Sequence, residues 1–146
     1  QKQSYFPITN KEMTRFNITL DQGVEFVKFC IDHSIGGEIF VPKLKSIRVV
    51  DIADAINPRL RKKIIGLRSG EKLHELMISK EDDLNTYEFD KGYIIFPNLN
   101  KAYFEYFKKL NIKKEKNGFF YSSEMNDFLN LKDIKSLIEN YKYNEK

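Results

Sequence analysis

The chain has 146 residues, of which 41% are hydrophobic, 32% charged and 14% aromatic. This composition supplies enough apolar side chains for a folded core, so it excludes wholesale disorder. No apolar run approaches the roughly 18 residues that a membrane-spanning helix needs. No charged-then-apolar leader opens the chain, so we expect neither membrane insertion nor secretion. The length fits one domain or a piece of a larger protein.

Charge and cysteine content limit the kinds of ligand, cross-link and metal site that the protein can have. Twenty-five basic residues against 21 acidic ones give a mild net charge of +4. Only a few of the basic residues are Arg, the residue whose planar fork fits phosphate or carboxylate. Cys30 is the single cysteine, which excludes an internal disulfide and a zinc site and favours a reducing cytoplasm.

The first third of the chain predicts an extended segment followed by a helix. Residues 1–18 have no helical period. Thr19 and Gln22 then form a capping box. An apolar stripe at helical spacing follows, formed by Leu20, Val24, Val27 and Ile31. The glycine pair at 36–37 ends this helix.

Short helices and strands alternate through the middle of the chain. Residues 38–41 predict a strand closed by proline, and residues 49–56 predict a helix. A buried strand is expected at 64–67 and a third helix near 71–78. Residues 86–96 have the pattern of a β-hairpin.

The last third predicts a helix at 100–110, a charged loop at 113–117 and an extended stretch at 119–121. Asn130 then caps a final amphipathic helix, whose tail after Tyr141 should fray. The alternation of helices and short strands indicates the α/β class.

The sharpest local feature is the segment 66–75, GLRSGEKLHE. A strand is expected to end there, with Arg68 on the turn and a helix opening one or two residues later. Free N–H groups at a helix start favour an anion, and Arg68 would add a bidentate grip on phosphate. Glu71 would then accept hydrogen bonds from a pair of sugar hydroxyls. The alternative is ordinary turn chemistry, with Glu71 facing the positive end of the helix dipole.

Arg15 is the second candidate, because it lies among apolar residues just before a capped helix. Together with Arg68 it would clamp a pyrophosphate from two sides. The alternative is an exposed arginine on a loop.

The other polar residues do not indicate a functional site. His74 has Glu71 and Glu75 nearby but no third ligand, so we expect no metal site. The acidic run 81–83 and the basic run 59–63 are typical of solvated surfaces. No glycine-rich dinucleotide fingerprint, P-loop or nucleophile elbow occurs, so no cofactor-binding residue is expected in this chain.

Three longer segments carry a family resemblance. They are MTRFNITL at 13–20, GGEIFVPK at 36–43 and IGLRSGEKLHE at 65–75. In this order they resemble the C-terminal half of the UDP-N-acetylglucosamine 4,6-dehydratases, which are extended short-chain dehydrogenases/reductases of polysaccharide biosynthesis. Residues 121–123, followed by a helix, resemble the end of the same family.

The resemblance implies an α/β fold that is the C-terminal portion of a Rossmann-like enzyme. Residues 1–96 would be the substrate-binding lobe and residues 97–146 a C-terminal extension ending in an amphipathic helix. The full enzyme would bind NADP in an upstream Rossmann domain, oxidise the sugar at C4, eliminate water across C5 and C6, and return the hydride to C6. The catalytic Tyr-x-x-x-Lys pair would lie in that upstream domain. No catalytic residue is therefore expected in this chain, which would be inactive alone.

By matching positions, the resemblance makes Arg15 and Arg68 the ligands of the UDP pyrophosphate and Glu71 the ligand of the uridine ribose. Met13 completes the implied substrate-binding set. The family usually has proline after the arginine of the third segment, whereas this chain has Ser69, which can cap a helix with its hydroxyl.

The implied enzyme is the cytoplasmic, C5-inverting branch of the family, serving bacterial surface-polysaccharide or flagellin-glycan synthesis. Its implied partners are a UDP-sugar and further copies of itself, with no nucleic acid and no membrane. A 4,6-dehydratase/5-epimerase or another nucleotide-sugar epimerase stays open as a sister activity. A small basic nucleic-acid-binding module is the alternative from another class, although basic and acidic residues alternate along the chain. A poorly folding fragment with open strand edges is the last alternative.

Overall fold

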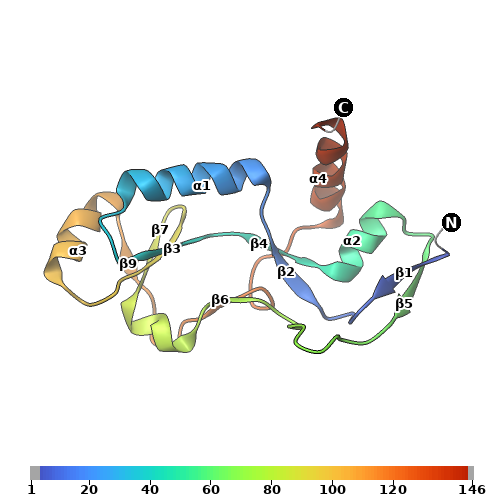
Figure 1. Cartoon of the computed structure of the whole chain (residues 1–146), viewed down its shortest axis with the longest axis horizontal. Helices are drawn as coiled ribbons and strands as arrows, with labels where there is room; N and C mark the ends of the chain where they lie inside the picture. The colour runs from blue at the N-terminus through green and yellow to red at the C-terminus, as the bar shows by residue number, and fades with distance from the viewer. Residues whose placement is uncertain (1–3, 145–146) are drawn as a thin grey trace. The chain divides into compact units, whose positions relative to one another are not determined.

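A computed structural model of the chain describes residues 4–144, and the side chains of residues 4–141. Its helices and short strands confirm the predicted α/β class (Figure 1). The chain forms two compact units that interleave along the sequence. The first comprises Gln1–Asn17, Lys45–Glu75 and Ser123–Lys146, and the second comprises Ile18–Leu44 and Leu76–Ser122.

The first unit contains two pairs of strands. Strand β1 (Tyr5–Ile8) runs parallel to β5 (Arg61–Ile64). Strand β2 (Thr14–Asn17) runs antiparallel to β4 (Lys45–Arg48). The segment predicted to be extended therefore carries two strands. Their partners lie some 30 to 60 residues further along the chain, so local pattern does not show the pairing.

Two helices complete this unit. Helix α2 (Val49–Ile56) has the predicted bounds, and it packs against α4 (Leu131–Asn144). Ala53 and Ile134 are buried at 5% and 2% exposure. The cap at Asn130 is confirmed, since its Oδ1 accepts hydrogen bonds from the N–H groups of two following residues. Helix α4 continues past Tyr141, and residues 145–146 of the predicted frayed tail lie outside the described residues.

The second unit is built on a four-stranded antiparallel sheet. Its strands are β3 (Ile39–Pro42), β8 (Gly92–Ile95), β7 (Thr86–Phe89) and β9 (Lys113–Lys114), in the order β3-β8-β7-β9. The hairpin β7–β8 confirms the prediction for residues 86–96. The short β9 lies in the segment predicted to be a loop, and it pairs with β7.

The second unit also contains helices and a further strand pair. Helix α1 (Leu20–His33) begins with the predicted capping box, and α3 (Lys101–Phe107) continues into the 3-10 turn η2 (Lys108–Leu110). A second 3-10 helix, η1 (Lys80–Asn85), precedes the hairpin. Strand β6 (Leu76–Ile78) pairs with β10 (Tyr121–Ser122).

An aromatic cluster forms the core of the second unit. Its buried members are Tyr87, Phe89, Ile94, Phe96 and Phe107. Helix α1 adds Phe26 and Phe29 from one side of the sheet. The predicted apolar stripe of this helix faces the other way, with Leu20 exposed at 83% and Ile31 at 72%. Aromatic stacking thus outcompetes the aliphatic stripe for the core.

The predicted helix near 71–78 does not form. Residues 71–75 have no regular structure and β6 follows them. Tertiary hydrogen bonds hold this backbone instead: Leu73 O accepts from the N–H of Thr14 at 3.1 Å, and Glu75 O accepts from the N–H of Ser123 at 2.8 Å. The strand predicted at 64–67 lies earlier, at 61–64, where it pairs with β1.

Candidate functional site

Arg15 projects from β2 and binds the irregular segment that follows Gly70. Its Nη1 donates to Leu73 O at 3.2 Å and to Thr14 O at 2.6 Å, while Nη2 donates to Lys72 O at 3.0 Å. Its Nε lies 3.7 Å from Oε1 of Glu75, and the side chain is 27% exposed. Most of the guanidinium donors are therefore used inside the protein, so Arg15 fixes the position of this segment.

Arg68 and Glu71 share a tight turn at the start of the same segment. The N–H of Arg68 donates to Oε2 of Glu71 at 3.1 Å, and the N–H of Glu71 donates to Arg68 O at 3.1 Å. Gly70 adopts a φ of 79°, which glycine reaches without strain. No helix begins here, so the predicted contribution of a helix start to anion binding is wrong.

The side chain of Arg68 is exposed, and within residues 4–141 no hydrogen bond or ion pair engages its guanidinium. A charged fork without an internal partner is suited to an external anion. Arg68 and Glu71 thus lie on one segment of the first unit, and Arg15, on β2 of the same unit, donates to the carbonyls of the two residues after Glu71.

Met13 occupies a different environment from the other candidates. Its side chain is 3% exposed, and its sulfur accepts a hydrogen bond from the Thr9 hydroxyl at 3.1 Å. Its carbonyl accepts from the N–H of Val49 at 3.0 Å. The role of Met13 in substrate binding stays a prediction, and a contribution from it would act through packing beneath β2.

A buried polar network surrounds Thr14, the residue before Arg15. The Thr14 hydroxyl lies 2.8 Å from Nδ1 of His74 and 2.7 Å from Oγ of Ser123. Thr14 is 4% exposed and Ser123 is fully buried. Nε2 of His74 lies 3.3 Å from Oε2 of Glu124. Sequence reasoning missed this network because 109 residues separate Thr14 from Ser123, although both lie in segments that resemble the family.

Glu75 ties the network to the strand that carries Arg15. Its N–H donates to Oγ of Ser123 at 2.9 Å, and its Oε2 accepts from the N–H of Phe16 at 2.8 Å. The end of the irregular segment is therefore held by both backbone and side chain, which offsets the lack of regular structure there.

The spacing Tyr-x-x-x-Lys does occur in this chain, at Tyr87 and Lys91, but on a hairpin. Tyr87 is 8% exposed, and burial raises the pKa of its hydroxyl. The Lys91 ammonium lies 5.0 Å from the centre of the Phe29 ring. A buried tyrosine of raised pKa on β7 is a core residue, not a poised acid, so no catalytic role follows for this pair.

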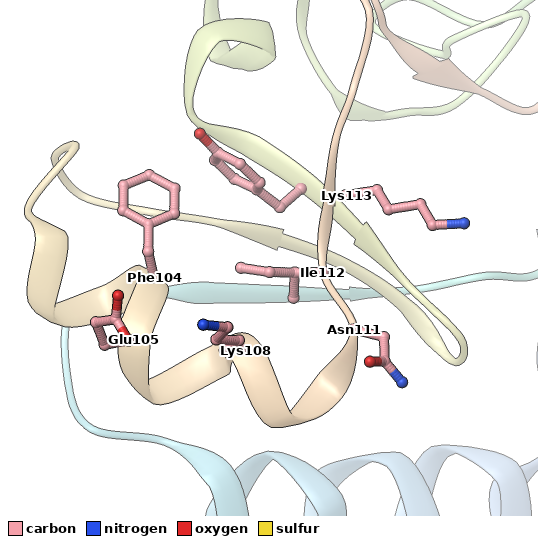
Figure 2. A pocket seen from close by; sticks show the side chains of 7 residues that line it. Phe104, Glu105, Lys108, Asn111, Ile112 and Lys113 are labelled. Carbon is pink, nitrogen blue, oxygen red and sulfur yellow. The ribbon is translucent and has the colours of Figure 1, made fainter.

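A pocket of about 510 Å³ lies in the second unit, between the sheet and the helical turn before β9 (Figure 2). Phe104 and Ile112 supply apolar surface, while Lys108, Lys113 and Glu105 supply charges of both signs. None of the four predicted site residues lines it. Its mixed charge selects no ligand class.

Residues 4–144 contain neither a metal-ligand cluster nor a membrane-spanning helix. No three His, Cys, Asp or Glu side chains gather there as a metal site would require. Nor does any helix in that range combine the length and apolarity needed to cross a bilayer.

The comparisons with known proteins agree on one family. The sequence profile described as "Polysaccharide biosynthesis protein" matches residues 1–97. A UDP-N-acetylglucosamine 4,6-dehydratase (inverting) from Campylobacter jejuni is 46% identical over 82% of this chain and 37% of its own length. Its counterpart from a second strain is 44% identical over 86% of this chain and 39% of its own length.

More distant similarities extend over nearly the whole chain. A UDP-glucose 4-epimerase from Rickettsia typhi is 32% identical over 90% of the chain and 40% of its own length. The solved structure of Pen from Bacillus thuringiensis matches with a TM-score of 0.80 and 25% identity, over 97% of this chain and 43% of that one. The chain thus spans about two fifths of the length of these relatives, and the predicted portion of an extended short-chain dehydrogenase/reductase fold is confirmed. The relatives include named dehydratases and epimerases of sugar nucleotides. The chain belongs to the polysaccharide biosynthesis protein family.

Proposed function

We propose that the chain is the nucleotide-sugar-binding portion of a UDP-N-acetylglucosamine 4,6-dehydratase of the C5-inverting branch. The observation that carries the proposal is the 46% identity, over 82% of the chain, to the Campylobacter jejuni enzyme of that name. The turn at residues 68–71 supports it, because the exposed guanidinium of Arg68 suits a diphosphate and the carboxylate of Glu71, three residues on, can accept from sugar hydroxyls.

Each candidate residue has a distinct task in this proposal. Arg68 binds the pyrophosphate with its planar fork. Glu71 uses the oxygen that the Arg68 N–H leaves available to accept a hydrogen bond from the uridine ribose. Arg15 contributes its positive charge and the hydrogen bonds that fix the neighbouring backbone. Rigid binding of UDP holds the sugar in a reactive orientation, which is worth several kcal/mol of a barrier, on the order of 7 or more in favourable cases.

The residues present do not fit a dinucleotide cofactor. None of the strand-to-helix connections within residues 4–144 contains a glycine, and β4 runs directly into α2 at Val49. A pyrophosphate-binding turn of the Rossmann type needs glycines at that junction. In this proposal NADP and the Tyr-x-x-x-Lys pair therefore belong to the part of the relatives' length that this chain does not match.

The biological setting is part of the same proposal. We assign the enzyme to the cytoplasmic synthesis of sugars for bacterial surface polysaccharide or flagellin glycan, as a homo-oligomer. The family description, polysaccharide biosynthesis, supports the first part. We propose a substrate-binding lobe at 1–96 and a C-terminal extension at 97–146, and the profile match over residues 1–97 supports this division. The two compact units divide the chain differently.

The test uses the native gene product that contains this sequence, supplied with UDP-N-acetylglucosamine. We expect a product lighter by one water in mass spectrometry. Arg68→Ala should raise KM about tenfold or more, since it removes a charged hydrogen-bond donor. Arg59→Ala, which removes an equal charge from an exposed position of the same unit, is the control and should leave KM unchanged. Equal kinetics for Arg68→Ala and wild type would contradict the role of Arg68.

A second candidate function is a UDP-sugar epimerase. The 32% identity to the Rickettsia typhi UDP-glucose 4-epimerase, over 90% of the chain, favours it. Interconversion of UDP-glucose and its C4 epimer, without loss of water from UDP-N-acetylglucosamine, would establish this alternative and overturn the first.

A further inference from the structure

With a neutral His74 ring, the buried polar network around Thr14 has one direction of hydrogen bonding. Nε2 of His74 faces a carboxylate of Glu124, which only accepts, so the neutral ring carries its proton on Nε2. Nδ1 is then an acceptor, and the Thr14 hydroxyl donates to it. The Thr14 oxygen in turn accepts from the Ser123 hydroxyl, whose oxygen accepts from the N–H of Glu75.

Every member of this chain of bonds depends on the next. If His74 lost its acceptor at Nδ1, one hydroxyl proton of the Thr14–Ser123 pair would have no partner, since the two hydroxyls can donate only to each other and are buried at 4% and 0% exposure. Unpaired buried hydroxyls are costly, so the segment would shift to satisfy them. The bond at risk is the one that the N–H of Glu75 donates to Oγ of Ser123, which anchors the end of the irregular segment.

The network and Arg15 hold neighbouring residues of the same short stretch. Arg15 bonds the carbonyls of Lys72 and Leu73, while Thr14, the residue before it, bonds the ring of His74. Lys72 directly follows Glu71, whose carboxylate receives the N–H of Arg68. A shift at His74 is therefore passed along only a few residues to the proposed UDP ligands.

We propose that His74 is a positioning residue for nucleotide binding: accepting a hydrogen bond from Thr14, it fixes the segment that carries Arg68 and Glu71. This inference rests on the proposed function, since the affected ligand is the uridine diphosphate group. His74 itself touches no nucleotide in this scheme, and its contribution acts through Thr14, Ser123 and Glu75.

The experiment uses pairs of variants in the native gene product and measures the dissociation constant of UDP by calorimetry. The oxygen of Asn occupies the place of Nδ1, so His74→Asn keeps the acceptor for Thr14. His74→Gln reaches the place of Nε2 and loses that acceptor. We expect His74→Gln and Thr14→Val to bind UDP about tenfold more weakly. His74→Asn and Thr14→Ser should remain within about twofold of wild type.

A merely structural role would lower the melting temperature of each variant without separating the members of each pair in affinity. Equal UDP affinity within both pairs therefore overturns the inference. Hydrogen exchange at the N–H of Glu75 supplies a second readout that needs no nucleotide. Absence of UDP binding by wild type would refute the proposed function. If the Glu75 N–H loses its protection in Thr14→Val and keeps it in Thr14→Ser, the inferred hold on the segment is supported even without nucleotide. Equal protection in the two variants would overturn it.

Discussion

The hydroxyl oxygens of Thr14 and Ser123 lie 2.7 Å apart, although 109 residues separate them in the sequence. This bond joins the second strand of the chain to the segment just before its last helix. The irregular stretch that carries Arg68 and Glu71 ends against it, because the N–H of Glu75 donates to the same Ser123 oxygen. The candidate site is thus supported by residues from three separated parts of the sequence.

Arg15→Lys should destabilise the protein by about 1–3 kcal/mol, because lysine cannot replace the bonds from Nη1 and Nη2 to the carbonyls of Lys72 and Leu73. Arg68→Lys should change the unfolding free energy by less than about 0.5 kcal/mol, since that side chain is exposed. Urea denaturation of both variants provides the measurement. A loss of equal size in the two would show that Arg15 does not hold the segment.

Phe29→Ala should cost roughly 2–3 kcal/mol, because the ring stacks on Phe89 at 5.4 Å between centroids and meets Phe40 edge-on at 6.1 Å. Ile31→Ser on the exposed face of the same helix should cost less than about 0.5 kcal/mol beyond the small difference in helix propensity. The comparison is again made by equilibrium unfolding. If Ile31→Ser is the more damaging change, α1 packs by its aliphatic stripe, contrary to the structure.

Gly92→Ala should destabilise the hairpin sheet by about 2 kcal/mol or more, because a Cβ at this position would collide with the carbonyl oxygen of Val41 on β3. Gly23→Ala is the matched control in α1. Its Cβ would lie 3.8 Å from Cδ1 of Ile18, an ordinary contact. Alanine in a helix interior should stabilise by about 0.5–1 kcal/mol. Opposite shifts in melting temperature are therefore expected, and shifts of the same sign would contradict the packing of Gly92.

Two carboxyl groups of the second unit should give opposite pH dependence. Burial raises the pKa of Glu115, with help from the charge of Glu88. For Glu38 burial acts in the same direction, but hydrogen bonds from the Ser34 hydroxyl and nearby backbone N–H groups outweigh it and lower the pKa. A raised carboxyl pKa favours folding below its ordinary value of 4.5, and a lowered one favours folding above it.

Unfolding free energies measured from acid to neutral pH test this pair. Glu115→Gln should become more stable than wild type as pH rises through and above 4.5. Glu38→Gln should be less stable than wild type at neutral pH, with the difference shrinking as pH falls below 4.5. Parallel profiles for the two variants would contradict the opposite environments of these carboxyls.

Local pattern predicted most of the helices and the hairpin. Thr19 with Gln22, and Asn130 before the last helix, carry their capping signals within three or four residues, so each helix start is encoded locally. The family resemblance rested on contiguous segments for the same reason. It identified Arg15, Arg68 and Glu71 as candidates without reference to any contact.

The sequence alone therefore determined the capped helices, the hairpin, the α/β class and the family. The tertiary structure decided how the segment after Gly70 is held and what surrounds Arg15. The helical spacing at 71–78 does not produce a helix, because the N–H groups of Thr14 and Ser123 donate to carbonyls of this segment. Satisfying these backbone groups across the chain outweighs a weak local helix propensity. Bonds between residues 57 to 109 positions apart leave no periodic trace in a sequence, so only the folded chain shows them.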